Sequence, residues 1–330
     1  MKRTQAGFTL IELMVSLVLF SFAIAGVLAV AVSMSQGFRD QRAAVNAEAA
    51  VRIPLDFIVD ALRQASPGAP TGTITDVGTV CQQGVMFVAN NQTAAHDATL
   101  TGWDQLEVIY AAGALVTSTR GVYTGGTTVL DVTDASQLAV GDYIVISNTS
   151  VGTLVKITAI STNQLTLAAQ CATPNLPAGG YSVGSIVVRA QHAVFFLDTV
   201  DGVPTLMMNP TGNASQNQTA GVSEPLAEGI EDMQIVLGVD TNADGVLTEV
   251  GAAAGDDEWQ GNVAGDPALV GTIRAVRVTL VARTTNSITG AANPFRRPAA
   301  EDHTQSATQD KYRRRILRST VEIRNMGASP

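Results

Sequence analysis

Residues 7–38 read GFTLIELMVSLVLFSFAIAGVLAVAVSMSQGF and are the most informative segment for the amino-terminal structure. After Glu12, no charged side chain occurs from Leu13 to Phe38, a run of 26 residues. As a helix at 1.5 Å per residue, this run would be about 39 Å long, which exceeds the ~30 Å hydrocarbon core of a bilayer. The sequence therefore predicts a membrane-spanning helix over residues 8–38.

The residues before this helix predict a short leader. Two basic residues, Lys2 and Arg3, are followed by Gly7, and the apolar run comes after the glycine. An ordinary secretory signal has its cleavage site after the apolar run, so cleavage there removes the run. A cut after Gly7 would instead leave the helix in the mature protein. We expect residues 1–7 to be a leader and the helix to be a working part of the protein.

Glu12 is an acid at the head of an otherwise apolar helix. A carboxylate inside a membrane costs a few kcal/mol and marks a functional residue by default. It is equally at home at the interface in the first helical turn, where the helix dipole favours an acid. On physical grounds both interpretations remain open.

The segment from Gly7 to Glu12 resembles the class III leader junction of type IV pilins and of type II secretion pseudopilins. The resemblance implies that prepilin peptidase cuts after Gly7 and methylates the new amino terminus at Phe8. It also implies that Glu12 pairs with the terminal amine of a neighbouring subunit, and that residues 8–38 pass from the inner membrane into the filament core. The expected location is the inner membrane with a periplasmic head, and then the cell-surface pilus.

The helical period continues beyond the apolar run, over residues 39–66. An apolar stripe at steps of three and four residues indicates an amphipathic helix. Its members are Val51, Leu55, Ile58, Leu62 and Ala65, and the opposite face carries Glu48, Arg52, Asp56, Asp60 and Arg63. We expect one helix over residues 8–65, about 87 Å long, with a kink or loosening at Pro54 unless the bend is accommodated.

Residues 67–330 are predicted to form a β-rich globular head, so the fold class is α+β with a long amino-terminal helix on an antiparallel sheet. The expected strands are 105–111, 127–132, 143–147, 153–160, 164–168, 185–197, 230–239, 272–283 and 314–324. Residues 121–181 look like a β-rich insertion. Strand 272–283 alternates and is predicted to be half-buried, and strand 314–324 is expected to direct Arg314, Arg318 and Glu322 outward.

The large head narrows the resemblance to minor pilins. Residues 229–240 (GIEDMQIVLGVD), a later strand with Arg274 and Arg277, and a closing strand over 313–325 are similar to the PilW-like minor pilins and the related minor pseudopilin J of type II secretion. The resemblance implies a subunit that primes or caps a type IV pilus. Its implied partners are other minor pilins, the major pilin, prepilin peptidase and the assembly platform. A type II secretion pseudopilin and a filament-borne adhesin are the alternatives.

Residues 240–246 (DTNADGV) place oxygen ligands on alternate residues before a glycine, which is how an EF-hand loop begins. Asp240, Asn242, Asp244 and the carbonyl of Val246 are therefore candidate calcium ligands. The closing acid expected at position 251 is a glycine. A tight turn rich in Asn, Asp and Gly forms without metal, so calcium is a candidate cofactor only.

The two cysteines, Cys81 and Cys171, are separated by 89 residues and have no diagnostic spacing. An exported chain with an even cysteine count favours pairing. Two small buried thiols are the alternative, and both interpretations remain open.

Charge and motifs argue against nucleic acid and against catalysis. The net charge is −9, which disfavours a polyanionic partner. The basic cluster Lys311, Arg313, Arg314 and Arg315 is expected to divide between two faces of a strand, so we expect no nucleic-acid binding. The three histidines, His96, His192 and His303, lie in no known catalytic motif, and we expect the protein not to be an enzyme.

Overall fold

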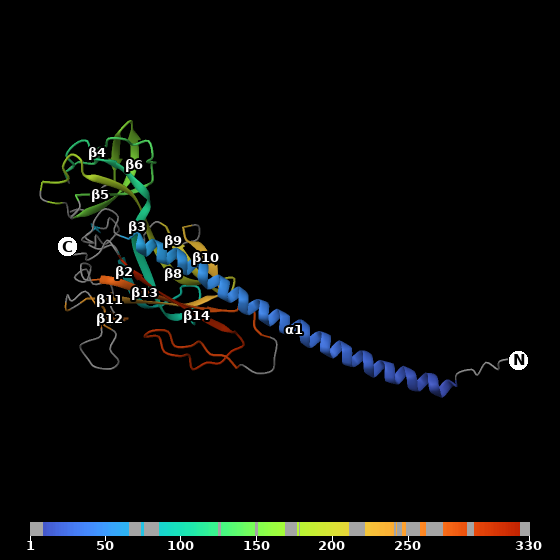
Figure 1. Ribbon diagram of the computed structural model, residues 1–330. Coiled ribbons are helices and arrows are strands. Elements are labelled where there is room, and N and C mark those ends of the chain that lie inside the picture. The colour runs from blue at the N-terminus through green and yellow to red at the C-terminus, as the bar shows by residue number, and fades with distance from the viewer. Residues whose placement is uncertain are drawn as a thin grey trace.

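The fold is taken from a computed structural model of the whole chain. It describes residues 9–65, 74–75, 86–124, 127–148, 151–168, 177, 179–210, 222–240, 242, 246–248, 258–261, 273–288 and 294–323. One long helix projects from a head built of β-strands (Figure 1). The predicted α+β class, with a long amino-terminal helix on a β-sheet head, is confirmed.

The single described helix, α1, runs from Leu10 to Arg63 without interruption. It continues through Pro54, although proline removes one backbone hydrogen bond from a helix. The helix ends by joining the head, because the Gln64 carbonyl accepts a hydrogen bond from the Ala111 amide at 3.0 Å. The predicted single helix is therefore present, slightly shorter at both ends than expected.

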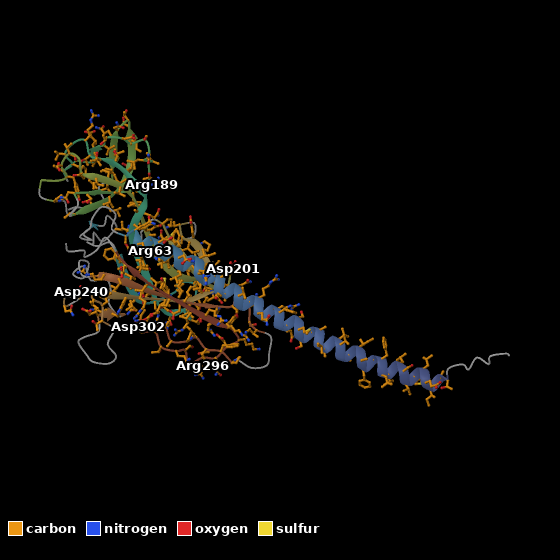
Figure 2. All side chains as sticks on the ribbon, viewed as in Figure 1. Arg63, Arg189, Asp201, Asp240, Arg296 and Asp302 are labelled. Carbon is orange, nitrogen blue, oxygen red and sulfur yellow. The ribbon has the colours of Figure 1, made fainter. Side chains whose placement is uncertain are left out.

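The two halves of α1 have different surroundings. From Leu10 to Phe38 the described side chains are exposed, and this half stands clear of the head (Figure 2). In the other half, the predicted apolar stripe is buried and the predicted polar face is exposed. The buried stripe contacts strands β3, β10, β13 and β14, so α1 is also the spine of the head.

The described strands form two sheets. The larger has the order β10-β9-β8-β5-β6-β7-β4, with β3 beside β8, β2 beside β3 and β1 beside β6. Its strands are β1 (Ile74–Thr75), β2 (Met86–Thr93), β3 (Thr101–Ser118), β4 (Val129–Asp131), β5 (Tyr143–Ser147), β6 (Gly152–Ser161), β7 (Gln164–Leu167), β8 (Ile186–Val200), β9 (Val203–Asn209) and β10 (Glu224–Glu228).

The smaller sheet has the order β12-β11-β13-β14 and is antiparallel throughout. Its strands are β11 (Ile230–Val239), β12 (Trp259–Gln260), β13 (Ile273–Arg283) and β14 (Arg314–Glu322). Strands β4 to β7 lie between β3 and β8 in the sequence and form a lobe at the end of the head away from the start of α1 (Figure 1).

Two expectations about strand faces were wrong. Strand β13 is not half-buried: Arg277 and Thr279, on the face predicted to be exposed, are covered. Glu301 reaches this face, accepts a hydrogen bond from the Thr279 hydroxyl at 2.7 Å and pairs with Arg277 at 3.3 Å. Arg314, predicted to point outward, has a 7% exposed side chain that pairs with Glu231 at 2.6 Å. In both cases a buried ion pair holds an arginine that the alternating pattern had predicted to be exposed to solvent.

Two isoleucines on α1 test how the helix is anchored. Ile58 is fully buried and Ile53 is 74% exposed. Replacing Ile58 by Ala should lower the free energy of unfolding of the head by about 2–5 kcal/mol, because it removes buried methylene groups and leaves a cavity. The same change at Ile53 should cost about 0.5 kcal/mol or less. Chemical denaturation of the full chain in detergent measures both, and equal losses would contradict this packing.

Candidate filament-assembly site

The start of α1 is organised by Thr9 and Glu12. Thr9 is the residue that caps the helix, and its hydroxyl accepts a hydrogen bond from the Glu12 amide at 3.3 Å. In return, Glu12 Oε2 accepts a hydrogen bond from the Thr9 amide at 3.0 Å. This reciprocal pair is a capping box, which satisfies two of the amide groups that a helix start leaves without intrahelical partners.

The capping box holds the Glu12 carboxylate over the first turn of its own helix. The Thr9 hydroxyl also donates to Glu12 Oε2, at 2.9 Å, so the carboxylate is oriented toward the amino-terminal end of the chain. The role of Thr9 was not predicted from the sequence. The spacing Thr-x-x-Glu before an apolar run was visible in the sequence and is the usual mark of such a box.

The hydroxyl groups inside the apolar half are satisfied within the helix. Ser16 donates to the Leu13 carbonyl at 2.9 Å, and Ser21 donates to the Leu17 carbonyl at 2.5 Å. These serines therefore do not need water. Within the described residues, one helix is long and apolar enough to cross a membrane, and its most apolar window has a mean hydropathy of 2.7 with no burial against the head.

The remaining predicted site residues are only partly described. Gly7, Phe8, Asp244, Cys81 and Cys171 lie outside the described residues, so cleavage, methylation and disulfide pairing stay predictions.

The described calcium candidates do not form a complete site by themselves. Asp240 is buried at the end of β11, near one end of the small sheet (Figure 2), and Arg274 Nε donates to its Oδ2 at 3.3 Å. Asn242 and Val246 are exposed. In the described part of the chain, no three His, Cys, Asp or Glu side chains are arranged to hold a metal ion. Calcium binding stays a prediction.

A buried acidic network joins the two sheets. Asp104 on β3 is fully buried, and its two oxygens accept hydrogen bonds from the Asn91 amide at 3.2 Å and from the Ile235 amide at 2.8 Å. Asn91 lies where the pairing of β2 with β3 is irregular. Strand β12 pairs with Leu237 and Gly238 of β11 and does not extend as far as Ile235. Asp104 thus accepts hydrogen bonds from two backbone amides that have no partner in the neighbouring strand pairing.

Asp232 is the second centre of this network. Its Oδ2 accepts hydrogen bonds from Arg297 Nη1 at 2.7 Å and from His303 Nδ1 at 2.9 Å. Gln234 Nε2 donates both to Asp232 Oδ1 and to the Gly102 carbonyl, each at 2.8 Å. These bonds tie β11 to β3 and to the segment before β14.

Each of the three histidines has a carboxylate partner, which the sequence did not reveal. His96 pairs with Asp198 at 2.7 Å, and His192 pairs with Glu107 at 2.6 Å. The pair of His303 and Asp232 resembles part of a catalytic arrangement. However, a Cβ atom at Gly102, which has a φ of +81°, would stand 2.5 Å from His303 Nε2. The ring nitrogen opposite the aspartate therefore abuts the backbone.

Two family models match the chain, one at each end. Residues 2–28, which include the capped start of α1, match the prokaryotic N-terminal methylation motif. Residues 194–325, from within β8 past the end of β14, match the type IV pilus-assembly protein W model. Together the two matches support a type IV pilus minor pilin of the PilW type, as predicted from the sequence. No curated protein and no solved structure matches it.

The acidic network makes stability depend on pH. Burial, reinforced by the charges of Asp302 and Asp232, raises the pKa of Asp104 to about 7. Between the usual pKa of an aspartate and this value, the folded state holds a proton that the unfolded state has lost. The free energy of unfolding should therefore fall by up to about 1.4 kcal/mol per pH unit as the pH rises from about 4 to 7.

The substitution Asp104→Asn should remove this contribution. It sacrifices one of the two acceptors, so the variant should be less stable than the native chain at pH 5, and the gap should narrow as the pH rises to 7. Urea denaturation of both chains at several pH values measures the difference. A gap that stays constant or widens over this range would refute the raised pKa.

Proposed function

We propose that this protein is a minor pilin that primes assembly of a type IV pilus and caps the filament, and that it has no catalytic activity. Prepilin peptidase would cut after Gly7 and methylate Phe8. The subunit would then wait in the inner membrane with its head in the periplasm. It would join other minor pilins and the major pilin at the assembly platform and reach the cell surface in the pilus.

One observation carries this proposal. The helix from Leu10 to Phe38 is apolar and has no cover from the described residues of the head, yet its first turn is capped and holds a carboxylate. An uncovered apolar helix of this length must lie in lipid or against other apolar helices. In either place Glu12 would need a positive partner, and the terminal amine of a neighbouring subunit, released at Phe8, has the required charge.

The capping box allows charge and structure to be separated at Glu12. Replacing Glu12 by Gln keeps the acceptor for the Thr9 amide, because glutamine also closes a capping box, but removes the charge. We expect incorporation into pili to fall at least about tenfold, since leaving a buried charge without its partner costs several kcal/mol. Immunoblots of sheared pili against the membrane fraction measure incorporation.

Two further variants complete this comparison. Glu12→Ala removes both the charge and the acceptor for the Thr9 amide and should behave like Glu12→Gln, while Thr9→Ala keeps the charge and should still be incorporated. All three chains should remain in the membrane. Normal incorporation of Glu12→Gln together with failure of Thr9→Ala would assign Glu12 to helix capping alone and refute the pairing.

Processing gives a separate test at Gly7. Replacing Gly7 by Leu should leave the leader attached, because a bulky side chain stands where the resemblance places the scissile glycine. The unprocessed Gly7→Leu chain should run as a larger band on a gel. Mass spectrometry of the native chain should show that it begins at N-methylated Phe8. The matched change Gln5→Leu should be processed normally. A native mature chain beginning at Met1 would overturn the proposal.

A further inference from the structure

Arginines gather where the apolar half of α1 meets the head. Arg39 and Arg42 are the first arginines after the apolar run, both are exposed, and their spacing of three residues places them on one face of the helix. Arg283, at the end of β13, lines the same groove, which has a volume of about 540 Å³. Thr285 and Asn286 complete its polar wall.

A second groove lies beside the same part of the helix. Ala47 lines both grooves, and the second, of about 230 Å³, is also lined by Arg313, Arg315 and Phe295. The guanidinium of Arg313 lies 5.7 Å from the centre of the Phe295 ring. Cations therefore flank α1 at this level, and we call Arg39, Arg42, Arg283, Arg313 and Arg315 the arginine collar.

The collar carries a local charge opposite to that of the whole chain. The chain has a net charge of −9, but the first groove is lined by three arginines and one acid, Glu228. Arg314 is not counted in the collar, because it is held by Glu231 and Asp310.

Arg283 has hydrogen-bonding capacity left over. Its guanidinium stacks on Tyr312 with 4.3 Å to the ring centre. Its Nε is buried and has no hydrogen-bond acceptor among the residues that the structure describes. A buried donor without an acceptor costs free energy, so an anion in the groove would have a ready partner here.

Arg39 and Arg42, which form the helix side of the collar, lie at the depth of lipid headgroups if the apolar half spans a bilayer. Leu10 to Phe38 would be about 43 Å long as a helix, close to the ~40–45 Å of a bilayer with its headgroup layers. Arg39 follows directly. On the membrane side of Arg39 and Arg42, a hollow of the helix surface is lined by Ala31, Met34 and Phe38.

We propose that the arginine collar binds the phosphate of an anionic phospholipid in the leaflet next to the head. One acyl chain would lie along Ala31, Met34 and Phe38. Guanidinium groups suit a phosphate because they donate two parallel hydrogen bonds to it. The site lies at the opposite end of the membrane segment from Glu12, so it would hold the waiting subunit at a defined depth and orientation.

Native mass spectrometry of the full chain, purified in an uncharged detergent, tests this proposal. With equal amounts of phosphatidylglycerol and phosphatidylcholine, the native chain should retain phosphatidylglycerol preferentially. Each collar arginine changed to Gln should weaken this retention about fivefold, as expected for a basic residue at an anionic lipid surface. The proteins to compare with the native chain are the double variant Arg39→Gln, Arg42→Gln and the single variant Arg283→Gln.

Arg52→Gln is the matched control, because Arg52 is an exposed arginine of the same helix farther from the apolar run. It should retain phosphatidylglycerol like the native chain. Equal retention of both lipids by the native chain, or an equal loss in the control, would overturn the proposal. Displacement of the lipid by excess inorganic phosphate would also overturn it, since the site would then hold any small anion.

Two further outcomes separate lipid binding from assembly. Glu12→Gln should retain phosphatidylglycerol normally even when it fails to enter pili. If the collar variants retain the lipid normally but are lost from pili, the collar contacts an acidic neighbouring subunit, and the lipid assignment is wrong.

Discussion

The apolar half of α1 is the feature that most restricts where this protein can reside. From Leu10 to Phe38 the helix presents large apolar side chains that the part of the head described by the structure leaves exposed. Burial of apolar surface contributes roughly 25 cal/mol per Å², so this segment is strongly driven into lipid or against other apolar helices. Because the head has its own core, folding does not depend on that burial, and the segment remains available for assembly.

The other half of α1 makes the head and the helix one unit. Its buried stripe contacts strands of both sheets, and the Phe57 ring packs edge to face against Phe195 on β8, with 6.0 Å between ring centres. A movement of the helix along its axis must therefore carry the head with it.

Side-chain hydrogen bonds and ion pairs stabilise the head where strand pairing leaves backbone amides without partners or buries charged side chains. Asp104 takes two such amides between the sheets, Asp232 gathers an arginine and a histidine, and Glu301 covers the outer face of β13. Such networks stabilise only when their members are satisfied. Through Arg297, Glu301 and His303 they tie the segment before β14 to the sheet.

Periodic patterns were reliable where one face of an element is buried and the other is solvated. The stripe on α1 repeats every three or four residues, because helical period is a local property of the chain. Strands β5 and β11 also have the predicted bounds, but they are buried on both faces, so their apolar runs and not an alternation marked them. Strand β9 was missed, although Asp201 and Gly202, both with positive φ, mark the tight turn before it. The burial of Arg277 and Arg314 was missed because their partners are distant in the sequence.

The amino-acid sequence alone determined the uncharged run, the acid at its head, the helical spine and the α+β class, since each follows from side-chain type and spacing. Only the tertiary structure decided which charges meet. Glu231 with Arg314, Asp104 with the Ile235 amide, and the grouping of Arg39 and Arg42 with Arg283 each join segments more than 80 residues apart. No local period encodes such contacts, because the fold brings their partners together by packing.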